Sequence, residues 1–119
     1  YTYKTVGMIE GVKVLEGIDG VHGLPVESHS SSAYISLDKE GTFREIRFYD
    51  ENHYVYKEIA YTHEGKLTNG NLSHKVLHIH VYTIRDDFSY DNRKPRLLTD
   101  EEYEKYKKYF IEVPENARR

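Results

Sequence analysis

Two histidines one residue apart, His78 and His80, are the clearest candidates for chemistry in this sequence of 119 residues. They stand in an alternating run typical of a β-strand, where side chains two positions apart project from the same face. Because an imidazole titrates near neutral pH, one ring can accept a proton while another donates one. Four of the seven histidines, the pair together with His63 and His74, fall within eighteen residues.

Cleavage of a phosphodiester through the ribose 2′-hydroxyl needs an acid, a base and a cation over the phosphate. Arg47, on the polar face of a predicted strand, could present a bidentate guanidinium to that phosphate. Lys57 offers a second charge, and Tyr34 and Tyr82 could stack on bases; the alternative for the tyrosines is ordinary packing. The residues that we expect to be catalytic are His63, His78, His80 and Arg47.

A metal site is an alternative use of the same histidines. Two imidazoles on one strand are common ligands of zinc or iron, but a site needs a third ligand. That ligand would be His63, His74 or a carboxylate such as Glu58 or Glu64. Acid–base chemistry requires no cofactor, whereas this alternative requires zinc. A third interpretation is that the pair merely forms the solvated side of an amphipathic strand.

The elements that must position these residues are four strands joined by short turns. Apolar and polar residues alternate over residues 33–37, 43–49, 54–61 and 76–82. Such a pattern predicts an antiparallel meander with one apolar face and one polar face. An N-terminal hairpin over residues 4–16, with a turn at Glu10 and Gly11, precedes a long glycine- and serine-rich loop over residues 17–32.

A C-terminal helix is predicted over residues 99–110. Thr99 is a good N-cap, Glu102 occupies the capping-box position, and Tyr103, Tyr106 and Phe110 form an apolar stripe at helical spacing. Residues 85–95 are charged and irregular, as in a connection. We therefore expect one α+β domain over residues 1–119, an antiparallel meander of four to six strands with the helix packed on its apolar face.

Composition narrows the functional classes. The net charge is −3 and the pI about 6.2, so a global basic field for nucleic-acid binding is absent and RNA would have to bind at a local patch. With no cysteine, neither a disulfide framework nor a thiolate metal site is available. No apolar run reaches the length of a membrane span. These features favour a cytoplasmic protein.

Several short motifs resemble a known group of domains. They are Gly23-Leu24-Pro25 with the serines that follow, Ile46-Arg47-Phe48-Tyr49-Asp50, the segment from Lys57 to His63, and His78-Ile79-His80. In order and spacing they resemble small domains at the ends of phage minor-capsid proteins and bacterial polymorphic toxins. Some of those domains are grouped with barnase-, EndoU-, colicin- and RelE-like ribonucleases.

The resemblance implies an α+β endoribonuclease-like sheet that cleaves RNA without metal. Carried over by position, Arg47, His63, His78 and His80 would surround the scissile phosphate. It also implies the partners of such domains, namely RNA, a parent phage or toxin polypeptide and an immunity protein. Because a fold can outlast its chemistry, a non-enzymatic binding or structural module of a phage or toxin locus is the alternative.

Overall fold

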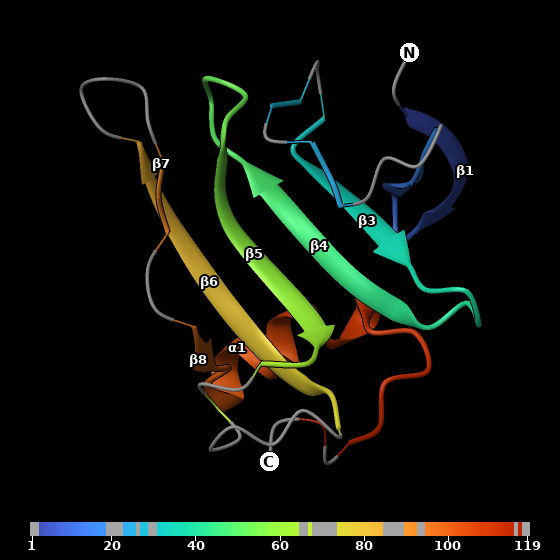
Figure 1. Ribbon diagram of the computed structural model, residues 1–119, viewed down its shortest axis with the longest axis vertical. Helices are drawn as coiled ribbons and strands as arrows, with labels where there is room; N and C mark the ends of the chain where they lie inside the picture. The colour runs from blue at the N-terminus through green and yellow to red at the C-terminus, as the bar shows by residue number, and fades with distance from the viewer. Residues whose placement is uncertain are drawn as a thin grey trace.

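The computed structural model describes residues 3–18, 23–25, 27–28, 31–64, 67, 74–84, 90–92, 95–115 and 117. Seven strands are hydrogen-bonded to one another in the order of the sequence, and an eighth pairs with β6. The strands are β1 (Tyr3–Ile9), β2 (Val12–Gly17), β3 (Ala33–Leu37), β4 (Phe43–Tyr49), β5 (Val55–Thr62), β6 (Val76–Ile84), β7 (Tyr90–Asn92) and β8 (Arg96–Leu97). Figure 1 shows β3 to β6 as the central part of this sheet.

The N-terminal hairpin forms as predicted. Glu10 and Gly11 both have positive φ, 50° and 81°, which is the conformation of a two-residue turn whose twist matches its strands. Strand β2, however, pairs with β3 in parallel, where an entirely antiparallel sheet was expected. A parallel neighbour cannot be reached through a tight turn, and this accounts for the long segment between the two strands.

The meander from β3 to β6 is antiparallel, as predicted. Aspartate side chains shape its first two turns. The Oδ1 atom of Asp38 accepts hydrogen bonds from the backbone of Glu40 and Thr42, and Oδ1 of Asp50 accepts one from Asn52. Such local bonds favour turns over continued strands.

The sheet has more strands than the four to six expected. The segment 85–95, predicted as an irregular connection, contains β7, and β8 follows it directly. Both short strands pair with β6, along Tyr82–Ile84 and His78–Ile79 respectively. Strands of two or three residues carry too little alternation to be recognised in a sequence.

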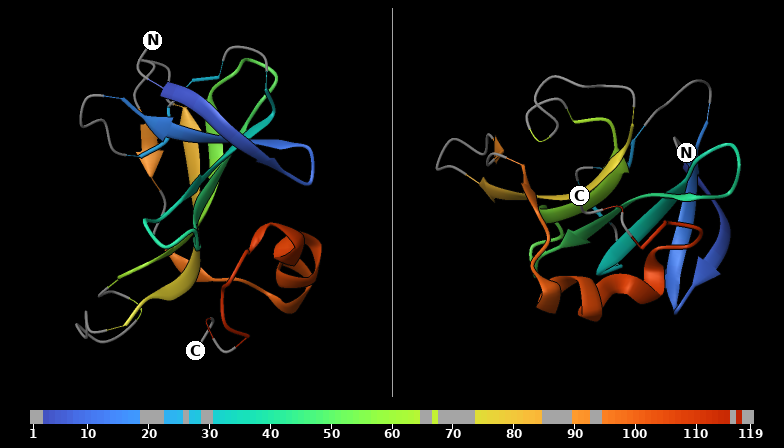
Figure 2. Two further views of the ribbon diagram at one scale, coloured as in Figure 1. Left: turned by 90° about the vertical axis from the view of Figure 1, so that its right-hand side faces the viewer. Right: turned by 90° about the horizontal axis from the view of Figure 1, so that it is seen from below.

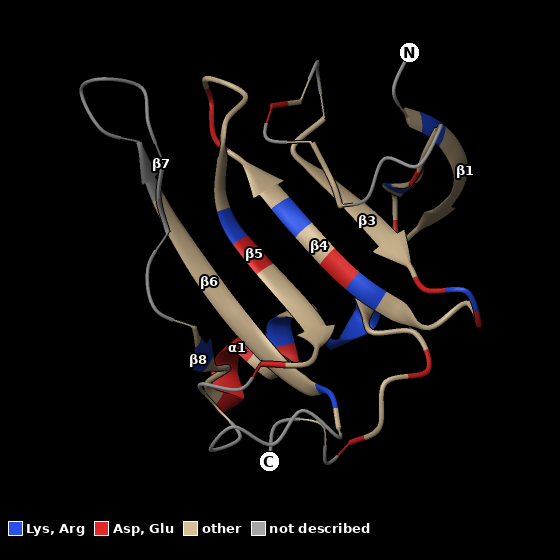
Figure 3. Cartoon of the chain, viewed as in Figure 1, with Lys and Arg blue, Asp and Glu red and all other residues tan. Residues whose placement is uncertain are grey.

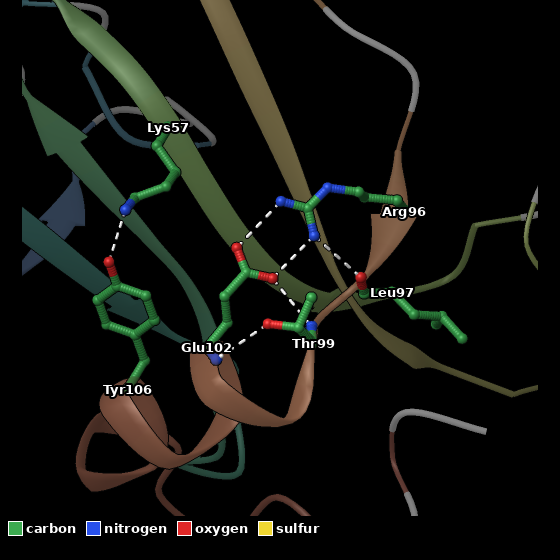
Figure 4. Close-up of polar contacts among 6 residues, drawn as sticks. All are labelled: Lys57, Arg96, Leu97, Thr99, Glu102 and Tyr106. Atoms are coloured by element: carbon green, nitrogen blue, oxygen red, sulfur yellow. Dashed lines mark hydrogen bonds and ion pairs between the residues drawn. The ribbon is translucent and has the colours of Figure 1, made fainter.

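Helix α1 (Asp100–Tyr106) continues into a 3₁₀ turn over Lys107–Tyr109. The predicted capping box is present: the backbone N–H of Glu102 donates to Thr99 Oγ1, and the Glu102 carboxylate accepts from the Thr99 N–H. Arg96 of β8 donates two hydrogen bonds to the same carboxylate, from Nη1 at 2.8 Å and from Nη2 at 3.0 Å. Figure 4 shows these bonds converging on the start of the helix.

The helix covers one face of the sheet, as Figure 2 shows. The buried residues between them form the main core: Val14, Ala33, Ile35, Phe43, Ile46, Ile59, Leu77, Ile79, Leu98, Tyr106, Phe110 and Ala117. After the helix, the carbonyl of Ile111 accepts a hydrogen bond from the backbone N–H of Phe43, the first residue of β4. The carbonyl of Ala117 accepts one from the N–H of Leu77 in β6. Among the described residues, no helix is long and apolar enough to cross a membrane.

Candidate functional site

The face of the sheet opposite helix α1 carries two rows of side chains across β4, β5 and β6. In one row, Arg47 pairs with Glu58 and Glu58 pairs with His80. The next row on the same face joins Glu45, Ala60 and His78. Neighbouring strands lie about 4.8 Å apart, so members of a row are direct neighbours. Figure 3 shows charged residues of both signs concentrated along β4 and β5.

Two carboxyl groups, Glu45 and Glu58, are buried side by side on this face, each 7% exposed. Burial, together with the hydrogen bond and charge of Glu58, raises the pKa of Glu45 to about 8. Burial acts the same way on Glu58, but the Glu45 hydrogen bond, the Arg47 charge and the Tyr82 hydroxyl outweigh it and lower the pKa of Glu58. At neutral pH the pair therefore holds one proton, on Glu45.

Arg47 is the cation of this face. Its Nε lies 3.5 Å from Glu58 Oε1, and its Nη1 donates to the backbone carbonyl of Leu24 at 2.6 Å. The contact with Glu58 is an ion pair without a hydrogen bond, since Nε is buried with no hydrogen-bond partner. Its side chain keeps 19% of its surface exposed. Although burial lowers the pKa of Arg47, the charges of Glu58 and Glu45 raise it further, so the guanidinium stays charged.

The segment between β2 and β3 packs over one part of this face. The backbone N–H of Leu24 donates to Glu45 Oε1 at 3.1 Å, and the Tyr49 hydroxyl donates to the Pro25 carbonyl at 2.6 Å. Further along the segment, the backbone N–H of Ser28 donates a hydrogen bond to the carbonyl of His53, in the turn after β4. This part of the predicted long loop therefore holds buried polar groups of the site in place.

The two strand histidines share a face, as alternation predicted. Their rings meet edge to face with centroids 5.0 Å apart. His78 is only 2% exposed, and its Nδ1 lies 2.8 Å from the Val76 carbonyl. Burial, followed by the charge of His80, lowers the pKa of His78, so that this ring is neutral at neutral pH. His80 is half-buried and stacks on Tyr82 at 6.5 Å.

The other two nearby histidines lie at the end of β5 and the start of β6. Both are exposed, and Nδ1 of His63 lies 3.1 Å from the His74 carbonyl. The residue that the structure brings to the histidine pair is Glu64. Its carboxylate and one ring nitrogen each of His78 and His80 all lie within 4.8 Å of one another. Among the described residues, this is the group whose atoms could together hold a metal ion.

Of the three residues predicted to bind substrate, Tyr34 and Tyr82 lie on the face of the histidine pair, whereas Lys57 does not. Lys57 lies on the helix-covered face, where its ammonium donates to the Tyr106 hydroxyl (Figure 4). The ammonium also lies 4.9 Å from the centre of the Phe48 ring. Tyr34 is buried edge-on against Tyr49 at 5.4 Å. The Tyr82 hydroxyl donates to Glu58 Oε2 at 2.6 Å. Lys57 therefore does not share a face with the histidine pair.

An open groove lies beside this face, between the ends of β2, β3 and β5. Lys39, Arg44 and Lys75 line it together with His63, and Ser36 and Gly23 form its border near Glu45. Neither Arg47 nor the histidine pair lines the groove. Glu16, Asp38 and Glu40 also line the groove, and Lys75 pairs with Asp38 at 3.3 Å, so its lining holds as many acidic as basic residues.

Sequence reasoning missed the carboxyl pair. Alternation along residues 43–49 places Glu45 and Arg47 on one face. The position of Glu58 beside Arg47 could have been inferred from the short turns between the strands. Those turns set the register in which Glu58 stands between Arg47 and His80. Glu64 was considered only as one of several third ligands, because it lies beyond the end of β5.

Comparison of the chain with protein-family models, with curated proteins and with solved structures found no match. The resemblance to phage and toxin domains therefore remains a prediction from short motifs.

Proposed function

We propose that this domain cleaves RNA by acid–base chemistry, without a metal ion, on the face that carries Arg47, Glu58 and His80. The observation that carries the proposal is the cross-strand row itself: a cation, a carboxylate and an imidazole are direct neighbours on three adjacent strands. A structural surface has no need to bury two carboxyl groups beside an arginine, because removing charges from water is costly.

The carboxylate of Glu58 is the base in this proposal. Its lowered pKa keeps it ionised while Glu45 holds the shared proton. Glu58 removes the proton from the ribose 2′-hydroxyl, and the 2′-oxygen then attacks phosphorus. The bond from phosphorus to the 5′-oxygen breaks, and protonated His80 gives its proton to that leaving oxygen. The products are a 2′,3′-cyclic phosphate and a free 5′-hydroxyl.

The proposal changes the expected acid–base pair from two histidines to a carboxylate and a histidine. His78 is buried and neutral, which suits a ring that supports His80 through its edge contact. Arg47 faces the same carboxylate and supplies the positive charge for the phosphate. In the neighbouring groove, where Lys75 is paired with Asp38, Lys39 and Arg44 would contact the backbone further along the RNA.

The test is cleavage of an end-labelled RNA oligonucleotide by the full chain in the presence of EDTA. Replacing His80 by Gln should slow cleavage by about 100-fold or more, the usual contribution of a general acid. The control, His74→Gln, changes an exposed histidine outside the row and should cleave at the normal rate. A substrate with a 2′-deoxyribose at the cleaved position should remain intact, since the attacking hydroxyl is missing.

His63→Gln distinguishes this assignment from one in which the exposed histidine is the acid. Loss of cleavage in His63→Gln with retention in His80→Gln would transfer the role to His63. RNA that stays intact with the unmodified chain would overturn the enzymatic proposal and favour a binding module of a phage or toxin polypeptide.

A further inference from the structure

Three potential ligands converge at the end of the polar face farthest from β7. Glu64, His78 and His80 each offer one ligand atom, and these atoms lie within 4.8 Å of one another. The meander brings them together: Thr62 pairs with Val76, so the chain leaving β5 passes beside the start of β6. Glu64 follows the last residue of β5 by two positions, and there its carboxylate reaches the histidine pair.

His78 is already oriented as metal-binding histidines usually are. Its Nδ1 lies 2.8 Å from the Val76 carbonyl, and since a carbonyl can only accept, Nδ1 carries the proton. The lone pair is then on Nε2. A backbone carbonyl that fixes the second ring nitrogen is a common feature around metal ligands, because it sets both the tautomer and the ring direction.

The ligand set has a recognisable chemical preference. Two imidazoles and one carboxylate suit Zn²⁺ and similar divalent transition-metal ions, with a fourth position left for water. In a tetrahedral zinc site the ligand atoms are about 3.3 Å apart, from bond lengths of about 2.0–2.1 Å. The three atoms therefore need only a modest closure, which the half-buried side chains of Glu64 and His80 can provide.

We infer that Glu64, His78 and His80 bind a divalent transition-metal ion of the Zn²⁺ class, and that this ion inhibits the domain by occupying His80. The binding part stands on these three residues alone, whereas the inhibition rests on the proposed function. A metal bound to one ring nitrogen of His80 occupies the lone pair that would otherwise carry the proton for the leaving oxygen.

Binding is tested first, on the full chain purified without a histidine tag. Co²⁺ should give the visible absorption of a tetrahedral site, and Zn²⁺ should displace it. Glu64→Gln and His80→Gln should each weaken Zn²⁺ binding more than about tenfold, since even residues that only orient ligands contribute that much. His74→Gln should bind as the unmodified chain does, and circular dichroism confirms that each variant is folded.

Absence of saturable binding, or equal weakening by His74→Gln, would overturn the site. Mg²⁺ is a further control, because it prefers oxygen ligands and should not compete with Co²⁺. Displacement of Co²⁺ by Mg²⁺ at similar concentrations would contradict the assignment of a nitrogen-containing site.

Inhibition is tested with the same RNA cleavage assay. Zn²⁺ should abolish cleavage by the unmodified chain, whereas Glu64→Gln should cleave normally in EDTA and resist zinc. Zinc binding without any cleavage in EDTA would reject the proposed function and leave the metal site intact. Cleavage in EDTA without zinc binding would reject the site alone, and activation by zinc would overturn the inhibitory role.

Discussion

The two faces of the central sheet are built from the same strands but hold different kinds of groups. On the helix-covered face, Ile35, Ile46 and Ile59 are fully buried among aliphatic and aromatic neighbours. On the opposite face the buried positions include Glu45, Glu58 and His78. Burial of apolar surface stabilises a fold, whereas burial of charged groups costs free energy unless they are paired. The comparison shows that one face buries the apolar core and the other buries ionisable groups.

Local structure supports this division. The polar face also has a small apolar cluster, Leu24, Tyr34, Tyr49 and Val55. Its two tyrosines pack edge to face. The hydroxyl of Tyr49 donates to the carbonyl of Pro25, in the loop that packs over the carboxyl pair. Packing on this face therefore encloses buried ionisable groups, whereas Lys57 on the other face is only partly buried. Each prediction below changes one side of this comparison, in order of decreasing effect.

Truncation of the apolar face should have the largest effect. Phe43 is 1% exposed and its ring packs on Phe110 at 5.0 Å. Phe43→Ala should lower the free energy of unfolding by about 3–5 kcal/mol, through lost burial and the cavity that remains. Urea denaturation measures the loss. Val6→Ala, at a residue 51% exposed, is the control and should change stability by less than about 0.5 kcal/mol.

Removing the cation of the polar face should be the next most costly change. Arg47→Met leaves Glu58 buried without its positive neighbour and should cost about 3 kcal/mol of unfolding free energy. The double variant Arg47→Met with Glu58→Gln removes the stranded charge as well. It should be more stable than the sum of the two single changes implies.

Arg44→Met is the matched control on the same strand, since Arg44 is exposed. It should be nearly neutral. Strict additivity of the Arg47 and Glu58 changes would show that the two side chains do not interact energetically.

The carboxyl pair predicts a pH dependence of stability. The pKa of Glu45 is raised from 4.5 to about 8, so the folded state holds this proton more tightly than the unfolded state. The resulting stabilisation is complete below pH 4.5 and is lost as the pH rises through 8. Glu58 has a lowered pKa, so its contribution is lost only at more acidic pH.

Glu45→Gln keeps an amide in place of the protonated carboxyl and should remove this dependence. Between pH 5 and 8 the unmodified chain should lose on the order of 3 kcal/mol of unfolding free energy relative to the variant. Urea denaturation across that range is the measurement. Parallel curves for the two proteins would mean that Glu45 is ionised in the folded state.

The cap of the covering helix should have the smallest effect. Thr99→Ala removes the hydrogen bond that the Glu102 N–H donates to Thr99 Oγ1 and should cost about 1 kcal/mol. Thermal unfolding monitored by circular dichroism detects a change of this size. Glu101→Gln, in the same turn but outside the capping box, should cost less; an equal loss would point to helix-end charge instead of the cap.

Much of the fold was predictable because its signals are local. The hairpin turn at Glu10 and Gly11, the four central strands and the capped helix each depend on neighbouring residues. The parallel pairing of β2 with β3 was not predictable, since it depends on where a long segment returns. Strands β7 and β8 were missed because their pairing with β6 defines them more than their composition does.

The site was predicted in part for the same reason. Alternation placed His78 and His80 together, and the structure confirms their shared face. Lys57 lies two residues before the core residue Ile59, so alternation alone places it on the helix-covered face, where it packs against the helix. The roles of Glu45 and Glu58 depend on burial and on each other, which neighbouring residues in sequence do not reveal.

The sequence by itself determined the alternation of faces, the turns and the helix start, because these follow from side chains within a few residues of one another. Tertiary structure alone decided which ionisable groups became neighbours: Arg47 beside Glu58, Glu58 beside His80, and Glu64 beside the histidine pair. The physical reason is that strand register and burial set charge interactions between residues distant in the chain, and both depend on the whole sheet.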